Sequence, residues 1–164
     1  MSNQVLPNFE TICFDFWLEP QYWNTPPSID IFIDNEKIDS VIVDQTMHYS
    51  FTHRLSFGYH NLKIHRQGKT HNESRVNNQG GYDTQSLTIT AIKIDNINVR
   101  NILWDQAEFV PDYPEPWATE QLALGQILEK KIKGEMILGH NGIWVFEFYS
   151  PFYQYIVDWV RNPR

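Results

Sequence analysis

Two alternating stretches decide the fold, FGYHNLKIH at residues 57–65 and DTQSLTITAIKID at residues 83–95. In the first stretch, Leu62 and Ile64 follow the turn residue Gly58 at every second position, the period of a β-strand with one buried face. The second stretch has the same alternation. Together they predict two neighbouring strands of an antiparallel β-sandwich, joined by a long polar segment.

The second stretch also changes phase. Leu87, Ile89 and Ala91 share one phase, whereas Ile92 and Ile94 share the other. Because a shift of one residue moves every later side chain to the opposite face, this pattern predicts a β-bulge or bend near Ala91. The following Asp-Asn pair at 95–96 predicts a tight turn.

Further strands are expected on both sides of these stretches. Alternating segments occur at residues 11–18, 28–34 and 49–55, with a short apolar run at 41–43. The turn residues 34–37 predict a hairpin, because Asp and Asn tolerate left-handed backbone conformations. Residues 137–148 read as strand, turn and strand around Asn141-Gly142.

The last third of the chain has a different character. Three prolines within residues 110–117 exclude a regular central strand and predict an extended connector, anchored by Tyr113 and Trp117 and followed by a short helix. Ser150-Pro151 resembles a helix start, and residues 152, 155, 156 and 159 recur at helical spacing. We therefore expect one domain, 1–164, with a β-sandwich core at 10–104, a proline-rich connector at 105–135, and a C-terminal hairpin and short helix at 136–164.

Composition excludes several classes of protein. The chain has 164 residues and a net charge of −7, which disfavours binding to nucleic acid. The single cysteine, Cys13, cannot form an intramolecular disulfide and is expected to be a small buried apolar residue. Residues 1–7 lack the pattern of a signal peptide, and no apolar run is long enough to span a bilayer. We expect synthesis in the cytoplasm and no membrane partner.

No catalytic motif is visible. The chain contains neither a Gly-x-Ser-x-Gly elbow nor a phosphate-binding glycine loop, so we do not expect an enzyme. The histidine pairs 48/53 and 60/65 are five residues apart, which places their members on opposite faces of a strand. Neither pair is therefore expected to bind a metal ion. Glu115, between two prolines, is expected to bond backbone groups of the connector. Asp83 and the 95–96 pair are oxygen donors suited to calcium, so a bound calcium ion is possible.

Aromatic residues are the main resource for binding. Tyr22 and Trp23 lie in a proline-rich loop, and Tyr82 ends the polar segment 66–81, which is expected to be a long exposed loop. Exposed rings beside Asn, Asp and Gln can stack on a sugar, although such rings also pin loops or contact a partner chain. Tyr22, Trp23, Tyr82, Tyr113 and Trp117 are therefore the candidate carbohydrate or partner contacts.

Residues 28–99 resemble the calcium-dependent xylan-binding modules. The similarity lies in the turn with Gly58 and His60, the strand with Leu62 and Ile64, and Asp83 leading into residues 87–96. This resemblance implies a jelly-roll-like β-sandwich that binds polysaccharide and calcium, with Asp83 as the tentative calcium ligand.

A second resemblance covers residues 113–121, 138–144 and 150–153, which look like segments of small proteins encoded by tailed phages. It implies a decoration, neck or tail accessory subunit that is assembled in the host cytoplasm and resides in the virion. The expected function is a non-catalytic structural or binding protein of a phage virion, in contact with other virion proteins and with copies of itself. The alternative is a calcium-dependent carbohydrate-binding module.

Overall fold

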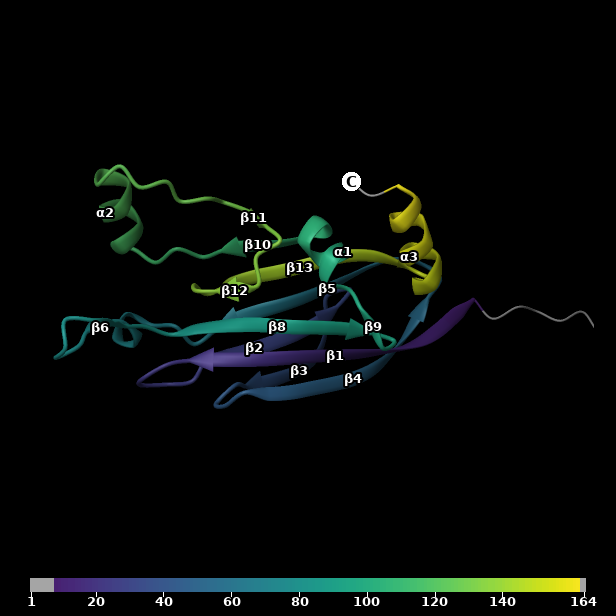
Figure 1. Ribbon diagram of the computed structural model, residues 1–164, viewed down its shortest axis with the longest axis horizontal. Helices are drawn as coiled ribbons and strands as arrows, with labels where there is room; N and C mark the ends of the chain where they lie inside the picture. The colour runs from purple at the N-terminus through teal and green to yellow at the C-terminus, as the bar shows by residue number, and fades with distance from the viewer. Residues whose placement is uncertain (1–7, 163–164) are drawn as a thin grey trace, which may run out of the picture.

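The computed structural model describes residues 8–162 and has the shape of a two-layer β-sandwich (Figure 1). The segment Met1–Pro7, considered above for a targeting signal, lies outside the described residues. Every strand pairing in the described part of the chain is antiparallel. Within that part, no helix combines the length and the apolar composition needed to cross a membrane.

The first sheet has five strands. Their spatial order is β12 (Ile137–Leu138), β8 (Ser86–Ile94), β1 (Phe9–Gln21) and β4 (Met47–Ser56), with β9 (Ile97–Asn98) paired to β8. The second sheet has six, in the order β11 (Ile132–Lys133), β10 (Ala107–Pro111), β13 (Gly142–Ser150), β5 (Gly58–Gln67), β2 (Ser28–Ile33) and β3 (Glu36–Ile42). The mainly antiparallel β-sandwich predicted from the alternating segments is confirmed.

The remaining elements lie at the edges and ends of the sandwich. They are the 3₁₀ turn η1 (His71–Glu73), the small hairpin β6 (Arg75–Val76) and β7 (Tyr82–Asp83), and the helices α1 (Arg100–Gln106), α2 (Trp117–Ala123) and α3 (Phe152–Arg161). The β6–β7 hairpin and α2 lie at one end of the long axis, and α3 lies at the other (Figure 1).

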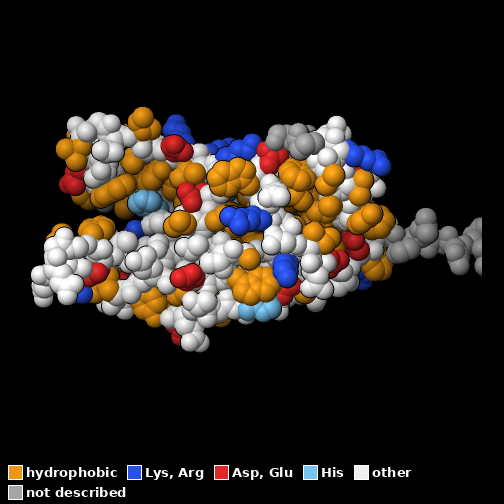
Figure 2. Space-filling view, in the orientation of Figure 1, with side chains coloured by type: hydrophobic (Ala, Val, Ile, Leu, Met, Phe, Trp, Pro, Cys, Tyr) orange, Lys and Arg blue, Asp and Glu red, His pale blue; other side chains and the backbone are white. Residues whose placement is uncertain are grey.

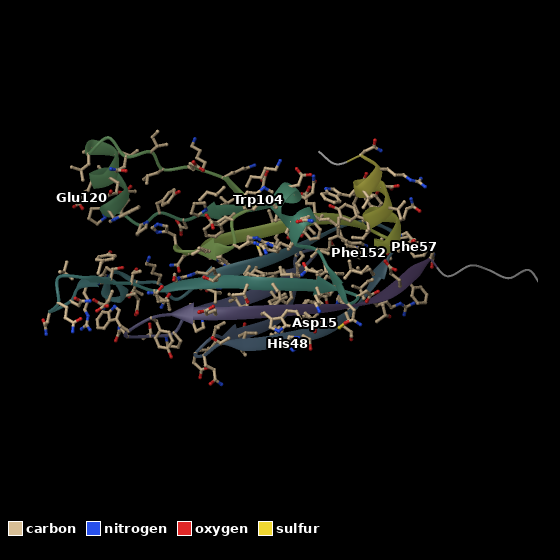
Figure 3. The ribbon with its side chains drawn as sticks, viewed as in Figure 1. Asp15, His48, Phe57, Trp104, Glu120 and Phe152 are labelled. Carbon is tan, nitrogen blue, oxygen red and sulfur yellow. The ribbon has the colours of Figure 1, made fainter. Side chains whose placement is uncertain are left out.

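Apolar side chains from both sheets fill the space between the layers. The strand β1 contributes every second residue, from Ile12 to Leu18, and Trp144 and Phe146 face it from β13. Cys13, on the opposite phase of β1, is only partly buried, so the expectation of a buried cysteine is wrong. On the outer face of the first sheet, Asp15 of β1 and His48 of β4 lie side by side (Figure 3). The Asp15 carboxylate is 2.7 Å from the His48 Nε2 atom.

The predicted local features of the strands are confirmed. The pairing of β1 with β8 shifts register between Trp17 and Leu18, opposite Ala91 and Ile89, which leaves Thr90 as the extra residue of the expected bulge. Both predicted Asp-Asn turns have left-handed backbones, with φ of 50° and 68° at residues 34–35 and 50° and 63° at residues 95–96. Such angles are those of a two-residue hairpin turn.

The predicted neighbours were wrong in two places. The strands β5 and β8 lie in different sheets and face each other across the core instead of pairing. Likewise β12 pairs with β8, whereas β13 pairs with β5 and β10, so the expected C-terminal hairpin around Asn141-Gly142 does not form. Alternation shows that a strand has one buried face, but it carries no information about which strand lies beside it.

The expected connector contributes strands of its own. Within residues 105–135, β10 pairs with β13 along its whole length and β11 pairs with β10. Pro111 is the last residue of β10, where a missing amide is tolerated. The helix α2 begins at Trp117, as expected, and ends before Gly125, whose φ is +81°.

The C-terminal helix is confirmed, but its start differs from the prediction. Phe152 and Tyr155 are buried, and Ile156 and Trp159 are half-buried against the core. The helix begins after Pro151, and no side chain of the Ser-Pro pair caps it. Instead, the Glu10 carboxylate accepts hydrogen bonds from the Ser150 hydroxyl at 2.5 Å and from the Phe152 amide at 2.7 Å. A distant strand thus supplies the cap.

Candidate functional site

A groove of about 420 Å³ lies at the end of the sandwich that carries α2. One wall is the segment that joins β5 to β8, and the other is the proline-rich segment before α2. In Figure 2 the groove is the hollow between the upper and lower lobes at the left. Its lining residues are Lys69, Thr70, His71, Ser74, Tyr82, Thr84, Asp112, Pro114, Glu115, Pro116, Trp117, His140 and Asn141.

A polar network forms the base of the groove. The Asn141 side chain accepts hydrogen bonds from the Arg66 guanidinium at 2.9 Å and the Lys69 amide at 3.0 Å, and its amide group donates to the Lys69 carbonyl at 2.9 Å. Arg66 is fully buried and also donates to the Gln85 carbonyl at 2.9 Å. The network therefore holds the chain beyond β5 against the start of β13.

Two cationic side chains lie at this base, Arg66, which is fully buried, and Lys69, which is half-buried. Burial, reinforced by the nearby Arg66 charge, lowers the pKa of Lys69 to about 8. The Lys69 ammonium donates to the Gly139 carbonyl at 2.5 Å. Burial also lowers the pKa of Arg66 to about 10, although the Glu73 carboxylate partly offsets this effect. The groove thus contains a positive charge at neutral pH.

An aromatic cluster forms the wall below α2. Trp117 lies 6.0 Å from Tyr113 and 5.0 Å from His140, measured between ring centroids, and Tyr113 meets the His140 ring edge-on at 5.1 Å. Burial and the Lys69 and Arg66 charges lower the pKa of His140 to about 4, so its imidazole is neutral at physiological pH. The wall presents a fixed aromatic face to the groove.

The carboxylate of Glu115 is used within the protein. It accepts hydrogen bonds from the Thr119 amide at 3.3 Å and the Thr119 hydroxyl at 2.7 Å, in the first turn of α2. This is the structural role predicted for it. Asp112 is the other acidic residue of the groove lining, and it is exposed.

The five predicted contact residues divide into two groups. Tyr82 and Trp117 both line the groove, although they are 35 residues apart in the chain, and Tyr113 stacks on Trp117. Tyr22 and Trp23 lie apart from this lining. The Tyr22 hydroxyl donates to the Asp44 carbonyl at 2.8 Å, and the Trp23 indole donates to the Glu73 carbonyl at 2.8 Å beneath the Arg75 guanidinium. These two rings anchor loops, which is the alternative role stated for them.

Glu73 joins the two loops at this end of the molecule. Its carboxylate accepts hydrogen bonds from Asn24 at 3.1 Å and from the hydroxyl and amide of Thr25 at 2.5 and 3.1 Å. Burial raises the pKa of Glu73, but these bonds and the Arg66 charge outweigh burial and lower it overall. The segment 66–81 was expected to be exposed throughout, and the burial of Arg66 and Glu73 corrects that expectation.

Both carboxylate oxygens of Asp83, the predicted calcium ligand, are bonded to side chains of the same chain. One of its carboxylate oxygens accepts a hydrogen bond from the Arg75 guanidinium at 3.0 Å, and the other accepts one from the Asn77 amide group at 3.2 Å. Calcium requires six to eight oxygen ligands, and a neighbouring guanidinium opposes a divalent cation. Within residues 8–162, no three His, Cys, Asp or Glu side chains are grouped as a metal site would need.

Several groove residues were not predicted from the sequence. Arg66 continues the inward phase of Leu62 and Ile64 on β5, so the alternation could have identified it as a buried charge that needs partners. Lys69 and Asn141 had no comparable signal, because they meet only through the packing of β13 against β5.

Comparisons with known proteins agree with this architecture. No family model and no curated protein sequence matches the chain. Two solved structures do, both of the carbohydrate-binding module vCBM60. The module in complex with galactobiose has a TM-score of 0.50 at 7% identity, over 82% of this chain and 96% of that one. A selenomethionine form, from work on two families of calcium-dependent modules, has a TM-score of 0.51 at 8% identity, over 82% and 89%. The predicted jelly-roll-like fold class is therefore confirmed.

Proposed function

We propose that the protein is a non-catalytic carbohydrate-binding module whose ligand lies in the groove between Tyr82 and Trp117. The observation that carries this proposal is that two aromatic side chains from distant segments line one groove over a base of polar groups. Sugar rings stack their apolar face on an aromatic ring, and their hydroxyls pair with surrounding donors and acceptors. The fold shared with vCBM60, which is known with bound galactobiose, supports the same class of function.

The groove supplies the polar partners that such a ligand needs. Lys69 and Asp112 contribute charged groups. The Ser74 and Thr84 hydroxyls are bonded to each other at 2.9 Å and the Thr70 hydroxyl accepts from the Asn72 amide, and each hydroxyl can form a further hydrogen bond to a ligand. The volume of about 420 Å³ lies within the range of small-molecule sites. We therefore infer that the ligand is a short segment of an oligosaccharide.

Binding in this groove is proposed to need no calcium. Of the two carboxylates in the lining, Glu115 is already bonded to Thr119, and the Lys69 ammonium lies in the same groove. Asp83 is bonded to Arg75 and Asn77. This donor set does not fit the calcium dependence that the comparison structure suggests. The same shortage of free carboxylates supports a binding role in place of glycoside hydrolysis, which uses two facing carboxyl groups.

The test is a titration of the whole chain with a panel of oligosaccharides that includes galactobiose and xylo-oligosaccharides. Tryptophan fluorescence and calorimetry measure the binding. Replacing Tyr82 by Ala should weaken binding about five-fold, since ring stacking contributes on the order of 1 kcal/mol. Tyr82 is 64% exposed, so the variant should keep its fold.

The matched control is Tyr153→Ala, because Tyr153 is 72% exposed on α3 and lines neither this groove nor the cavity considered below. It should bind like the native chain. The proposal is wrong if no oligosaccharide of the panel binds, or if Tyr82→Ala and Tyr153→Ala have equal effects.

The role in a tailed-phage virion stays a prediction. One observation favours an interface with another protein: the chain after α2 exposes Leu124 by 74% and Ile127 by 88%. Exposed apolar residues that lie near one another are typical of interaction surfaces. Mass measurement of the purified protein, and its detection in purified particles, would support oligomerisation and location in a virion. A monomer absent from particles would refute both.

A further inference from the structure

A second cavity lies at the opposite end of the sandwich from the groove. It has a volume of about 300 Å³ and is formed by residues at the ends of β5 and β13 together with α1 and α3. Its lining residues are Tyr59, Gln106, Glu147, Phe148, Tyr149, Tyr155, Asp158, Trp159 and Asn162. Nothing in the proposed carbohydrate-binding function uses these residues.

Strand register explains why two tyrosines and a glutamate come together here. Tyr59 on β5 is directly opposite Tyr149 on β13, so both side chains leave the same face of the sheet. Glu147 is two residues before Tyr149 and therefore shares that face. Its carboxylate makes no hydrogen bond or ion pair with another part of the described chain, residues 8–162.

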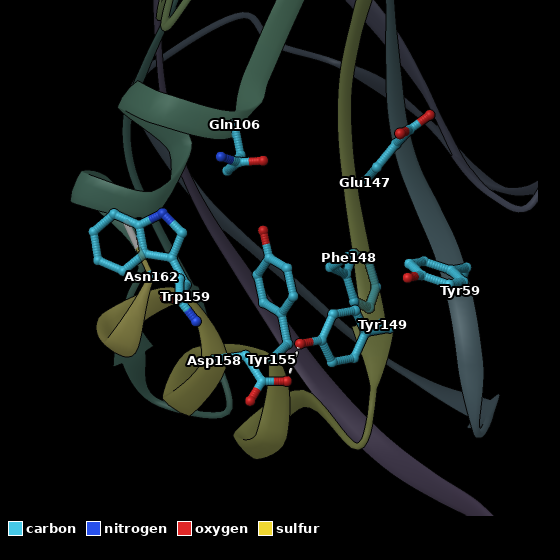
Figure 4. Close-up of a pocket in the computed structure, with 9 residues that line it drawn as sticks. All are labelled: Tyr59, Gln106, Glu147, Phe148, Tyr149, Tyr155, Asp158, Trp159 and Asn162. Carbon is cyan, nitrogen blue, oxygen red and sulfur yellow. Dashed lines mark hydrogen bonds between the residues drawn. The ribbon is translucent and has the colours of Figure 1, made fainter. Parts of the chain in front are cut away.

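The helix α3 supplies the facing wall. Tyr155, Asp158 and Trp159 are three and four residues apart, which places them on one side of the helix. The Trp159 indole donates to the Asp105 carboxylate at 3.1 Å, so this ring is held against α1. The Tyr149 hydroxyl donates to Asp158, as the dashed line in Figure 4 shows.

The rings meet at steep angles instead of forming a flat platform. The Tyr59 and Tyr149 rings are 5.6 Å apart at 76°, and the Tyr149 and Tyr155 rings are 5.0 Å apart at 90°. Figure 4 shows Tyr149 and Tyr155 between Trp159 on one side and Tyr59 on the other. Edge-to-face contacts of this kind are ordinary aromatic packing, and Tyr59, which is 86% exposed, keeps ring surface open to a compact cation.

The charges of the lining have the same sign. Glu147 and Asp158 are its only ionisable groups apart from the tyrosines, and no Lys, Arg or His belongs to the lining. Hydrogen bonds from Tyr149 and Gln154 lower the pKa of Asp158, although burial opposes them and the Arg161 charge assists. The bond to Asp158 and burial raise the pKa of Tyr149 to about 12, so its ring stays neutral.

We propose that this cavity binds a small organic cation of the alkylammonium type, held over the Tyr59 and Tyr149 rings beside the Glu147 and Asp158 carboxylates. A tetraalkylated nitrogen has no proton to donate and spreads its charge over methyl groups, so it suits aromatic faces better than it suits hydrogen-bond acceptors.

The experiment is an NMR titration of the isotopically labelled chain with choline and, in parallel, with 3,3-dimethylbutan-1-ol, the neutral molecule of nearly the same shape. Free N-trimethyllysine is titrated in a third arm, because a modified side chain presents the same cation. We expect choline or trimethyllysine to shift resonances of α3 and β13, and the neutral alcohol to bind at least about ten-fold more weakly. Equal binding of the alcohol would overturn the proposal, as would the absence of any shift with both cations.

Variants locate the site. Tyr59→Ala should weaken cation binding about two- to five-fold, as expected for the loss of one exposed cation–π contact, and Tyr59→Phe should restore it. Tyr59 is 86% exposed, so neither variant should disturb the fold. Glu147→Gln should also weaken binding, whereas Tyr153→Ala should not. Shifts confined to the groove residues would contradict the assignment, and they would do so whether or not a glycan binds there.

Discussion

At the scale of single residues, two carboxylates, the buried Glu73 and the half-buried Glu10, hold together segments that are far apart in the sequence. Glu73 connects the loop after β5 to Asn24 and Thr25, and Glu10 on β1 caps the start of α3. Each carboxylate accepts hydrogen bonds from several protein groups, and these bonds offset the free energy lost when the charged group leaves water. Such a role depends on partners that alternation patterns do not reveal.

Replacing Glu73 by Gln should lower the free energy of unfolding by about 1–3 kcal/mol at pH 7, because the variant loses a charged acceptor for three buried hydrogen bonds. Since its pKa is lowered in the folded protein, Glu73 stabilises above its unfolded pKa of 4.5, and the effect should shrink as the pH falls below that value. Denaturant titration at pH 7 and pH 4 measures both effects. Glu120→Gln, at an exposed position on α2, is the control (Figure 3). Equal stability of the two variants would contradict the role of Glu73.

His140 should make the fold sensitive to mild acid. Its pKa is about 4 in the folded protein and 6.5 in the unfolded one, so the unfolded state binds more protons between these values. Stability should therefore fall as the pH decreases from 6.5, by at most about 1.5 kcal/mol at pH 5. His140→Phe should flatten this dependence in a series of thermal melts, whereas His71→Phe should leave it unchanged. An unaltered pH profile in His140→Phe would count against a buried neutral imidazole.

At the scale of elements, the crossing between the two sheets sets the shape of the groove. The chain leaves β12 in one sheet and enters β13 in the other within residues 139–141, and Asn141 bonds Arg66 and Lys69 on the way. At the next residue, Gly142, the backbone passes close to β10. A β-carbon there would lie 2.4 Å from the Val110 carbonyl oxygen and 2.8 Å from the Pro111 α-carbon.

Gly142→Ala should therefore destabilise the protein by about 2–3 kcal/mol, because the added methyl group meets backbone atoms that cannot rotate away. Chemical denaturation measures the change. Gly139→Ala is a matched control three residues earlier, where a β-carbon has no neighbour within 4 Å. If the two substitutions lower the free energy of unfolding equally, the close backbone contact is not the reason that residue 142 is glycine.

At the scale of the whole molecule, the sandwich has the fold of a carbohydrate-binding module, and the proposal that it needs no calcium can be tested on the intact chain. Hydrophobic packing between two sheets holds the fold, and within residues 8–162 no three His, Cys, Asp or Glu side chains are grouped. A ligand that binds only the folded state raises its stability, so calcium should leave this protein unaffected.

The melting temperature should be the same in calcium and in chelator, and oligosaccharide binding in the groove should survive the chelator. Differential scanning calorimetry and the glycan titration measure the two quantities on the same sample. Magnesium at equal ionic strength is the control for general salt effects. A rise in melting temperature with calcium but not with magnesium would show that the protein binds calcium. It would contradict the proposal that binding in the groove needs no metal.

The residues themselves determined much of this protein. The period of two in residues 57–65 and 87–94, the phase change near Ala91, the Asp-Asn turns and the helical spacing after Pro151 depend on local backbone geometry, and the structure bears them out. These features depend on residues that are close in the sequence, so they can be predicted from the sequence alone.

Only the tertiary structure decided which strands are neighbours, and with them the two candidate sites. The groove joins Tyr82 to Trp117, and the cavity joins Tyr59 to Trp159, because β13 pairs with β5 and β10 while β12 crosses to the other sheet. Strand pairing through backbone hydrogen bonds is nearly independent of the side chains involved. The choice of partner therefore depends on how the whole core packs, and no single segment encodes it.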